Sequence, residues 1–379
     1  MAACTAAQRH RLHLGLYPPP NGISPLTSTT SPSSVHWVDG PRQQAFDAWL
    51  DSIAPQHNLA PASLRNASSD ASFRRYLRID AADGRSLIVM DAPPPHEDVR
   101  PFIAVAAMFE GAGLNAPRVL QQHPEQGFLL LTDLGNKNYL PALQDLLASG
   151  EQSKADSLMR DAIAALVQWQ SRAPATALPP YDDALLRREL GLFPEWCLGR
   201  ECGKAWSADE HLQWLQACDL LAASALAQAT VAVHRDYMPR NLMVCEPNPG
   251  ILDFQDAVNG PISYDVASLL RDAFLSWDEE VEIDWAIRYW EAARKVSLPV
   301  PADFGDFWRA LEWMGLQRHL KVLGIFCRLK HRDGKAGYAD DLPRFFNYSH
   351  KVASRYNTLR PLARLLEPLM GAQRADVYF

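Results

Sequence analysis

One stretch of the chain combines acidic, amide and basic side chains at a spacing that could transfer a phosphoryl group. It reads His-Arg-Asp at 234–236, then Asn241, a short apolar run, a turn, and a second apolar run that ends at Asp253. An aspartate five residues before an asparagine lets one tight loop present a base to an acceptor hydroxyl and an amide oxygen to a metal ion. A second aspartate returned by a hairpin would complete a Mg²⁺ site, because Mg²⁺ prefers hard oxygen ligands.

These residue types predict separate roles within the loop. Asp236 is the predicted catalytic base, and Asn241 and Asp253 are the predicted Mg²⁺ ligands. His234 is interpreted as a scaffold that holds the loop, and Asp265 as a carboxylate that bonds backbone amides around it. The alternative is that His234 and Asp236 are ordinary loop residues that cap nearby helices. The two flanking apolar runs and the second aspartate favour the catalytic interpretation.

Two segments upstream are predicted to hold a nucleotide. The turn at 68–72 would offer backbone N–H groups and serine hydroxyls to the phosphates, although it holds no glycine and a plain hairpin is an equal alternative. The segment that joins the two predicted lobes would bond adenine through its backbone. The predicted nucleotide-binding residues are Ser68, Ser69, Ser72, Arg75, Thr132, Asp133 and Leu134.

The third predicted strand lacks the lysine with which kinases bind the α- and β-phosphates. It reads Leu-Ile-Val-Met-Asp at 87–91, with Met90 at the position expected for lysine. Arginines at 74, 75 and 78 on the neighbouring strand are the candidates for the missing charge, and solvated or ion-paired arginines are the contrary interpretation. We expect Arg75, which shares a face with the apolar residues, to supply it.

The elements that must position these groups follow two patterns. Residues 1–40 are rich in Pro, Ser and Thr and are expected to be disordered. Residues 41–135 predict a nucleotide-binding lobe with a five-stranded antiparallel sheet, whose first three strands lie at 63–68, 73–79 and 87–90. Residues 136–379 predict a helical lobe that carries the catalytic loop, with helices near 163–170, 207–228, 263–275, 279–295, 304–331 and 341–373. The predicted fold is therefore α+β, two-lobed and protein-kinase-like.

Bulk composition narrows the class of protein. The 379 residues are 47% hydrophobic and 21% charged, with a net charge of −7, so a large core is expected and a basic nucleic-acid-binding face is not. The six cysteines show no CxxC pattern and are interpreted as reduced thiols. No apolar run is long enough to span a membrane. We therefore expect a cytoplasmic protein with no nucleic-acid, membrane or obligate protein partner.

Several longer motifs resemble those of the aminoglycoside phosphotransferase superfamily: VHRDYMPRNLMV, GILDFQDAVNGPISYDVASLLRD, and SDASFRRYLRI with LIVMDAPPP. Within it, the chain is most similar to the bacterial N-acetylmuramate/N-acetylglucosamine anomeric kinases of cell-wall recycling, which the segments 90–93 and 315–326 also resemble. The resemblance covers about residues 42–370. It implies ATP- and Mg²⁺-dependent phosphorylation of the anomeric hydroxyl of an amino sugar, giving the sugar 1-phosphate.

The resemblance also implies contacts with the sugar. N-acetylmuramate carries a lactyl carboxylate that a cation should meet, and the candidates are Arg271, Arg318 and Lys321. Ion pairs with acidic residues of the chain are the alternative for these cations. Two other functions stay open: a kinase of the same fold for an aminoglycoside, choline or homoserine, and a non-catalytic nucleotide-binding scaffold, which only Met90 supports. A protein kinase is disfavoured because Phe-Gln, and not Phe-Gly, follows Asp253.

Overall fold

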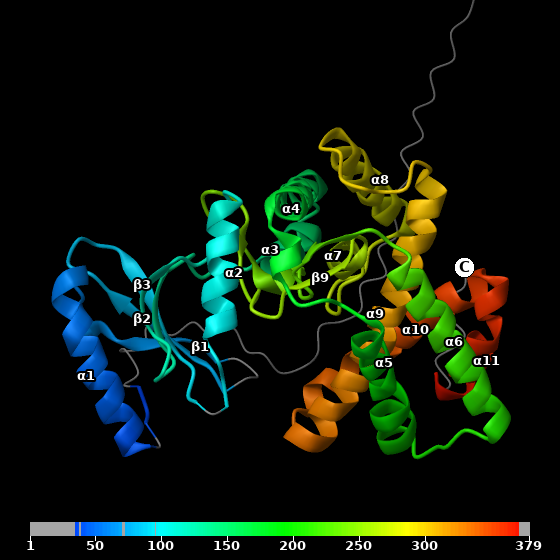
Figure 1. Ribbon diagram of the computed structural model, residues 1–379, viewed down its shortest axis with the longest axis horizontal. Helices are drawn as coiled ribbons and strands as arrows, with labels where there is room; N and C mark the ends of the chain where they lie inside the picture. The colour runs from blue at the N-terminus through cyan, green and yellow to red at the C-terminus, as the bar shows by residue number, and fades with distance from the viewer. Residues whose placement is uncertain (1–34, 38, 70–72, 95, 371–379) are drawn as a thin grey trace, which may run out of the picture.

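The computed structural model describes residues 35–37, 39–69, 73–94 and 96–370. They form a small lobe around an antiparallel sheet and a larger, mainly helical lobe, so the predicted two-lobed α+β fold is confirmed (Figure 1). The predicted disordered tail, residues 1–40, lies outside the described residues except for residues 35–37, 39 and 40.

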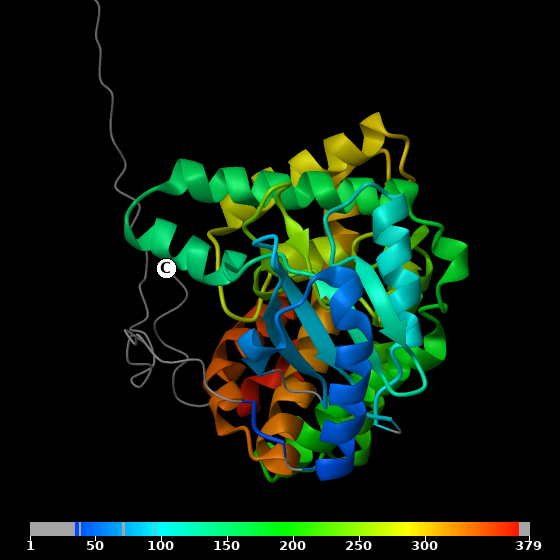
Figure 2. The same cartoon turned by 90° about the vertical axis from the view of Figure 1, so that its left-hand side faces the viewer.

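The small lobe is built on the five-stranded antiparallel sheet that the sequence predicted, in the order β1-β2-β3-β5-β4. Its elements are α1 (Gly40–His57), β1 (Arg65–Ser69), β2 (Arg75–Asp80), β3 (Ser86–Asp91), α2 (Arg100–Gly111), β4 (Val119–His123) and β5 (Phe128–Thr132). Helix α1 covers the outer face of the sheet, and α2 covers the face toward the large lobe (Figures 1 and 2). Because strand side chains alternate between faces, Leu77 and Val89 pack under α1, whereas Met90 packs under α2.

Helix α1 starts where its sequence supplies a cap. The Asp39 side chain accepts the backbone N–H of Arg42, and Pro41 occupies the first turn, where its missing N–H costs nothing. The helix buries the apolar stripe that periodicity predicted: Phe46, Trp49, Leu50 and Ile53. The ring centroid of Trp37 lies 4.9 Å from that of Phe46, so the chain packs on the small lobe even before the helix begins.

The large lobe surrounds two short strand pairs with helices. The helices are α3 (Tyr139–Ala148), α4 (Gln152–Arg172), α5 (Asp183–Leu192), the π-helix η3 (Phe193–Glu201), α6 (Ala208–Leu226), α7 (Tyr264–Leu270), α8 (Glu279–Lys295), α9 (Phe304–Asp333), α10 (Leu342–Arg355) and α11 (Arg360–Leu366). The strand pairs are β6 (Thr230–Val233) with β9 (Val258–Pro261) and β7 (Leu242–Met243) with β8 (Gly250–Ile251). Helix α6 opens with the predicted capping box of Ser207 and Glu210.

The single helix expected over 341–373 is wrong, because the chain forms α10 and α11 with a break between them. Tyr356 is extended at the break, and Pro361 opens α11. A proline there has no N–H to donate to the preceding turn, and its ring would clash with the carbonyl four residues back, so a continuous helix is disfavoured.

Helix α9 crosses the core of the large lobe. All residues from Gly315 to Gly324 on it are buried, including three that carry titratable groups. A Cβ atom at Gly324 would lie 2.5 Å from the carbonyl carbon of Leu192, so glycine is what allows α9 to approach the end of α5. Among the described helices, none combines the length and the apolar character that crossing a membrane requires.

Candidate active site

The loop after β6 is held by a buried, neutral histidine. The Nδ1 atom of His234 accepts the backbone N–H of Asp236 at 3.3 Å, and its Nε2 lies 3.0 Å from the carbonyl oxygen of Leu252. The ring therefore carries its proton on Nε2 and donates it to that carbonyl. Burial lowers the pKa of His234 to about 4 from its ordinary 6.5. This arrangement supports a scaffold role for His234, since it joins the loop to the residue before Asp253.

Asp265, near the start of α7, holds the same loop from the other side. Its Oδ2 accepts the N–H of His234 at 2.7 Å, and its Oδ1 accepts the N–H of Arg235 at 3.0 Å. Arg235 has a φ of 76°, a left-handed conformation that residues other than glycine rarely adopt. Burial raises the pKa of Asp265 to about 7, against the two amides that favour the charged form. Asp265 thus bonds loop amides, the role expected for it, and stabilises a strained turn.

Asp236 and Asn241 meet within this loop. The side-chain amide of Asn241 donates through Nδ2 to the carbonyl oxygen of Asp236 at 2.9 Å. That bond orients the amide and leaves its Oδ1 atom available to a ligand. Tyr237 between them is fully buried and donates its hydroxyl to the carbonyl of Ala162 on α4 at 2.7 Å, so the loop is anchored to the lobe. Asp236 itself is half-buried.

Asp253 returns to this loop through the predicted hairpin. Strands β7 and β8 pair Leu242 with Ile251, and the N–H of Leu252 donates to the carbonyl of Asn241 at 2.9 Å. Asp253 follows directly, and its Oδ1 accepts a hydrogen bond from Nε2 of the Gln255 side-chain amide at 2.9 Å.

The ligand set fits a hard divalent cation. Asn241 and Asp253 offer one amide oxygen and one carboxylate from adjacent positions of the hairpin. The described residues contain no group of three or more His, Cys, Asp or Glu side chains suited to a metal. Mg²⁺ commonly takes one or two protein oxygens and completes its shell with water and phosphate oxygens, so this pair suits it.

The side chains predicted for the hinge are already bonded within the protein. Thr132 Oγ1 accepts the N–H of Arg118 at 2.9 Å. Asp133 accepts from Arg78 at 2.6 and 3.0 Å and from the N–H of Gly135 at 2.9 Å. Although burial opposes ionisation, Arg78 lowers the pKa of Asp133. These two side chains are therefore engaged within the protein, and a contact of this segment with adenine stays a prediction for its backbone.

The predicted phosphate-binding serines lie at the end of β1. Ser68 pairs in register with Tyr76, and Ser69 with Arg75, so their backbone reaches the turn that joins β1 to β2. Ser72 lies outside the described residues. Leu134, the last of the predicted nucleotide-binding residues, packs close to Gly250 of the hairpin, where an added Cβ would lie 2.9 Å from its Cδ1.

Arg75 does not lie where the missing lysine would. It bonds Asp91, and its guanidinium lies 3.9 Å from the ring centroid of Trp37, on the sheet face that α1 covers. Met90 lies on the opposite face. This placement contradicts the expectation that Arg75 supplies the lysine charge, because alternate residues of a strand face opposite sides of the sheet. Arg74 has its Nε 3.4 Å from Oε2 of Glu97, just before α2 and thus on the large-lobe side.

Sequence reasoning missed a buried carboxylate beneath the loop. Glu189 of α5 accepts from Arg235 at 2.6 Å and pairs with Lys321 of α9 at 3.1 Å. Burial opposes its ionisation, but Lys321 and Arg235 lower the pKa of Glu189 to about 2. Lys321 also donates to the hydroxyl of Tyr264 at 3.0 Å. Nothing local in the sequence marks Glu189, because its partners come from distant parts of the chain.

The two other predicted sugar-binding cations differ from one another. Arg271 is buried and pairs with Glu282 at 3.0 Å and Glu312 at 3.3 Å, the internal pairing that was its alternative. Arg318 is also buried, but its Nη2 donates to the sulfur of Met238 at 3.9 Å. The structure thus brings Arg318 to the catalytic loop and gives Arg271 a structural role.

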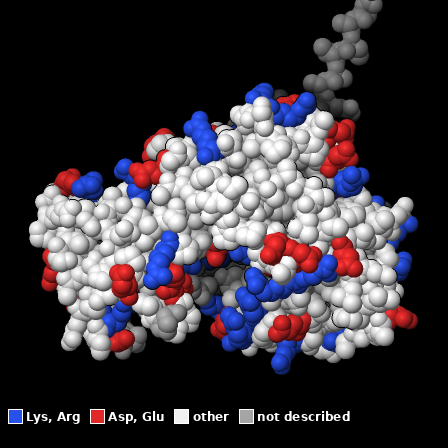
Figure 3. Space-filling view, in the orientation of Figure 1, with Lys and Arg blue, Asp and Glu red and all other residues white. Residues whose placement is uncertain are grey.

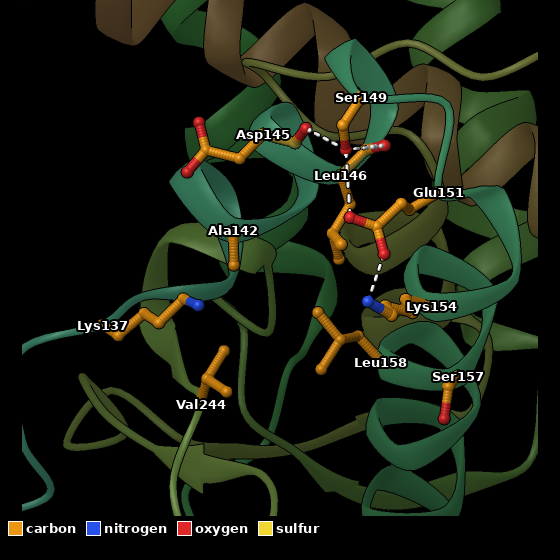
Figure 4. A pocket seen from close by; sticks show the side chains of 10 residues that line it. All are labelled: Lys137, Ala142, Asp145, Leu146, Ser149, Glu151, Lys154, Ser157, Leu158 and Val244. Carbon is orange, nitrogen blue, oxygen red and sulfur yellow. Dashed lines mark hydrogen bonds and ion pairs between the residues drawn. The ribbon is translucent and has the colours of Figure 1, made fainter.

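The described surface is hollowed in more than one place. One hollow opens between the lobes, with Lys and Arg side chains gathered on its large-lobe rim and acidic ones among them (Figure 3). A second, a pocket of about 450 Å³, lies between α3 and α4 beside Lys137 and Val244, where Glu151 pairs with Lys154 (Figure 4). No residue of the catalytic loop or the hairpin ligands lines this second pocket, so it is given no part in the chemistry.

Known proteins are similar to this chain in sequence and in fold. Residues 63–310 match the family model described as "Phosphotransferase enzyme family". The chain is 51% identical over 343 residues to the N-acetylmuramate/N-acetylglucosamine kinase of Pseudomonas aeruginosa, covering 88% of this chain and 99% of that protein. A protein of the same name from Neisseria meningitidis is 45% identical over 338 residues, covering 89% and 99%. The ADP-bound crystal structure of aminoglycoside phosphotransferase APH(2'')-Ib has a similar fold, with a TM-score of 0.55, 14% identity, and 83% and 99% coverage.

Proposed function

The chain belongs to the phosphotransferase enzyme family, and we propose that it is a kinase of N-acetylmuramate and N-acetylglucosamine. Near-full-length similarity to relatives that bear this name supports the sugar substrates. The observation that carries the chemistry is the hairpin that brings Asp253 to Asn241, next to the half-buried Asp236. A binding scaffold without catalysis has no need of all three groups.

The proposed reaction transfers the γ-phosphoryl group of ATP to the anomeric hydroxyl of the sugar. A bond forms between that oxygen and the γ-phosphorus, the bond to the β-phosphate oxygen breaks, and ADP leaves. Asp236 accepts the hydroxyl proton. An anomeric hydroxyl is more acidic than an ordinary alcohol, so a carboxylate base is sufficient. The product is the sugar 1-phosphate, which suits peptidoglycan recycling in the cytoplasm, where ATP is available.

The chain's own residues do the positioning on which phosphoryl transfer mainly depends. We assign Asn241 and Asp253 to Mg²⁺, which when bound neutralises charge on the phosphates. His234 and Asp265 hold the base in place through their bonds to loop backbone. The hinge backbone at 132–134 holds the adenine, and the backbone at Ser68 and Ser69 lies over the phosphates.

For the positive charge absent at Met90 we propose Arg74. Its partner Glu97 precedes α2 on the large-lobe side of the sheet, and this contact supports Arg74 over Arg75. Protein kinases hold their strand lysine with a glutamate of the neighbouring helix, so a cation held by a carboxylate serves the same purpose from another strand.

A coupled ATP-turnover assay tests the substrate assignment. It compares N-acetylmuramate, N-acetylglucosamine, an aminoglycoside and choline, and phosphorus NMR identifies the product. We expect turnover with the two amino sugars and a 1-phosphate. A 6-phosphate, or turnover with the non-sugars alone, would refute the proposal, and absence of turnover with all four would favour the scaffold.

Two substitutions test the residue roles. Asp236→Asn should reduce turnover by at least about 10³-fold while nucleotide binding stays intact, because the variant keeps the shape of the side chain and loses the base. Asp253→Ala should weaken the binding of Mg²⁺-ATP. Asp219→Asn, an exposed aspartate on α6, is the matched control and should leave both unchanged. Near-normal turnover in Asp236→Asn would remove that residue from the role of base.

A further inference from the structure

Arg318 is a buried cation that forms no ion pair with a carboxylate among the residues that the structure describes. Only 3% of the residue is exposed. Its Nη1 atom has no hydrogen-bond partner among the described residues, and its Nη2 meets the sulfur of Met238 at 3.9 Å. The neighbouring buried cations are different, because Arg271 and Lys321 each pair with glutamate at 3.0 to 3.3 Å.

The nearby carboxylates form no ion pair with Arg318 within the described part of the chain. Both oxygens of Asp265 accept loop amides, at 2.7 and 3.0 Å. Asp272 accepts the N–H of Phe274 through Oδ2 at 3.2 Å, and its Oδ1 has no hydrogen-bond partner among the described residues. These two acids act on the charge of Arg318 from beyond ion-pair distance, and the Nη1 donor of Arg318 stays without a hydrogen bond.

A guanidinium cannot relieve this situation by losing its proton. A charge buried away from water without a partner is strongly unfavourable, so such groups are retained where a ligand completes them. Two parallel N–H donors on a planar group match the two oxygens of a carboxylate. The ligand chemistry that suits Arg318 is therefore a small carboxylate.

Arg318 lies directly behind the catalytic loop. Met238, which it contacts, is two residues after Asp236, and the N–H of Met238 donates to the carbonyl of Asp236 at 3.0 Å. Met238 is half-buried, and a methionine side chain has the freedom to move aside for a ligand. An acceptor held at Asp236 is thus close to the guanidinium of Arg318.

We propose that Arg318 binds the lactyl carboxylate of N-acetylmuramate and so determines how the enzyme treats that sugar relative to N-acetylglucosamine. This inference rests on the proposed function. The two sugars differ by the lactyl ether that carries the carboxylate, so one of them engages Arg318 and the other does not. Arg318 is a specificity-determining residue, and Arg271 and Lys321 support the lobe.

The test is kcat/KM of Arg318→Met and Arg318→Lys for each sugar. In Arg318→Met we expect kcat/KM for N-acetylmuramate to fall about 10- to 100-fold, the usual effect of losing bonds between charged groups, and kcat/KM for N-acetylglucosamine to stay within about threefold. Arg318→Lys keeps the charge without the paired geometry and should lose less. Arg309→Gln, an exposed arginine on the same helix, is the control and should change neither value.

A readout on the wild-type enzyme keeps the test valid if a variant folds poorly. The carboxamide of N-acetylmuramate should be a poorer substrate than N-acetylmuramate for the wild type by a similar factor, and Arg318→Met should no longer distinguish the two. Thermal unfolding separates a structural role, because Arg318→Met should melt no lower than wild type once the unpaired charge is gone. Equal losses for both sugars, no loss for either, or undiminished discrimination against the carboxamide would each overturn the inference. If the wild-type enzyme phosphorylated neither sugar, the proposed function would be refuted instead.

Discussion

The substitution Asp265→Asn should separate activity from stability in this enzyme. The carboxylate accepts two backbone N–H groups, from His234 at 2.7 Å and from Arg235 at 3.0 Å. An asparagine can accept only one of them, and its NH₂ group would face the other donor. Losing a hydrogen bond to a charged group costs about 1.5–3 kcal/mol. The bond also holds Arg235 at a φ of 76°, a conformation that itself costs about 1–2 kcal/mol.

The same substitution removes a burial cost. Burial raises the pKa of Asp265 from its ordinary 3.8 to about 7. A group with a raised folded-state pKa stabilises the fold fully below its unfolded pKa, and that contribution is lost as pH rises through the folded value. At pH 7.5 the ionised Asp265 therefore costs roughly 4 kcal/mol, which a neutral amide avoids. This gain offsets the lost bond, so global stability at pH 7.5 should fall little or rise.

The assay compares kcat with the free energy of unfolding in urea at pH 7.5. Asp265→Asn should lower kcat about 10- to 100-fold, because the loop leaves its competent conformation, while KM for ATP changes little. Asp91→Asn is the matched control: this buried carboxylate pairs with Arg42 and Arg75 on the far face of the sheet, so its loss should reduce stability and spare kcat. Normal kcat in Asp265→Asn, or a loss of kcat that merely follows unfolding, would refute the reasoning.

Three further predictions concern α9 and the small lobe. Gly324→Ala should destabilise the protein by about 1–3 kcal/mol, because the added Cβ would lie 2.5 Å from backbone. Gly315→Ala, where the nearest atoms to the added Cβ are 3.7 Å away, should be neutral or stabilising by up to about 1 kcal/mol. Urea unfolding measures both, and a change in unfolding free energy of the same sign for the two variants would contradict this. Burial lowers the pKa of His319 to about 3, so the stability that its neutral form contributes is present above pH 6.5. The free energy of unfolding should therefore fall by about 1 kcal/mol between pH 6.5 and 5.5. His319→Gln should flatten this pH dependence of stability, and an unchanged pH dependence would exclude His319 as its source. Arg74→Gln should raise KM for ATP about tenfold or more, and Arg75→Gln should raise it by less than about threefold. Equal effects of the two substitutions in steady-state kinetics would refute the proposal that Arg74 supplies the phosphate-binding charge.

The catalytic groups could be predicted because they are close in sequence. Asp236 and Asn241 share one loop, and a short hairpin returns Asp253, so their relative placement depends on local geometry that spacing records. The two lobes were predictable for a related reason, since alternation of apolar residues in strands and their helical spacing in the large lobe are local patterns. The break between α10 and α11 was missed although Pro361 marks it.

The partners of the charged side chains were decided by tertiary structure alone. Arg75 and Arg74 are neighbours in sequence, yet one lies under α1 with Asp91 and the other beside Glu97, because the sheet separates its two faces. Arg271 and Arg318 likewise look equivalent in the sequence. Only the fold pairs the first with glutamates, while none of the described residues forms an ion pair with the second. The chemistry of an ionisable group depends on its burial and on charges within a few ångströms, and distant segments supply both. The sequence by itself therefore indicated the reaction, and the tertiary structure decided which of the charged side chains are paired within the protein.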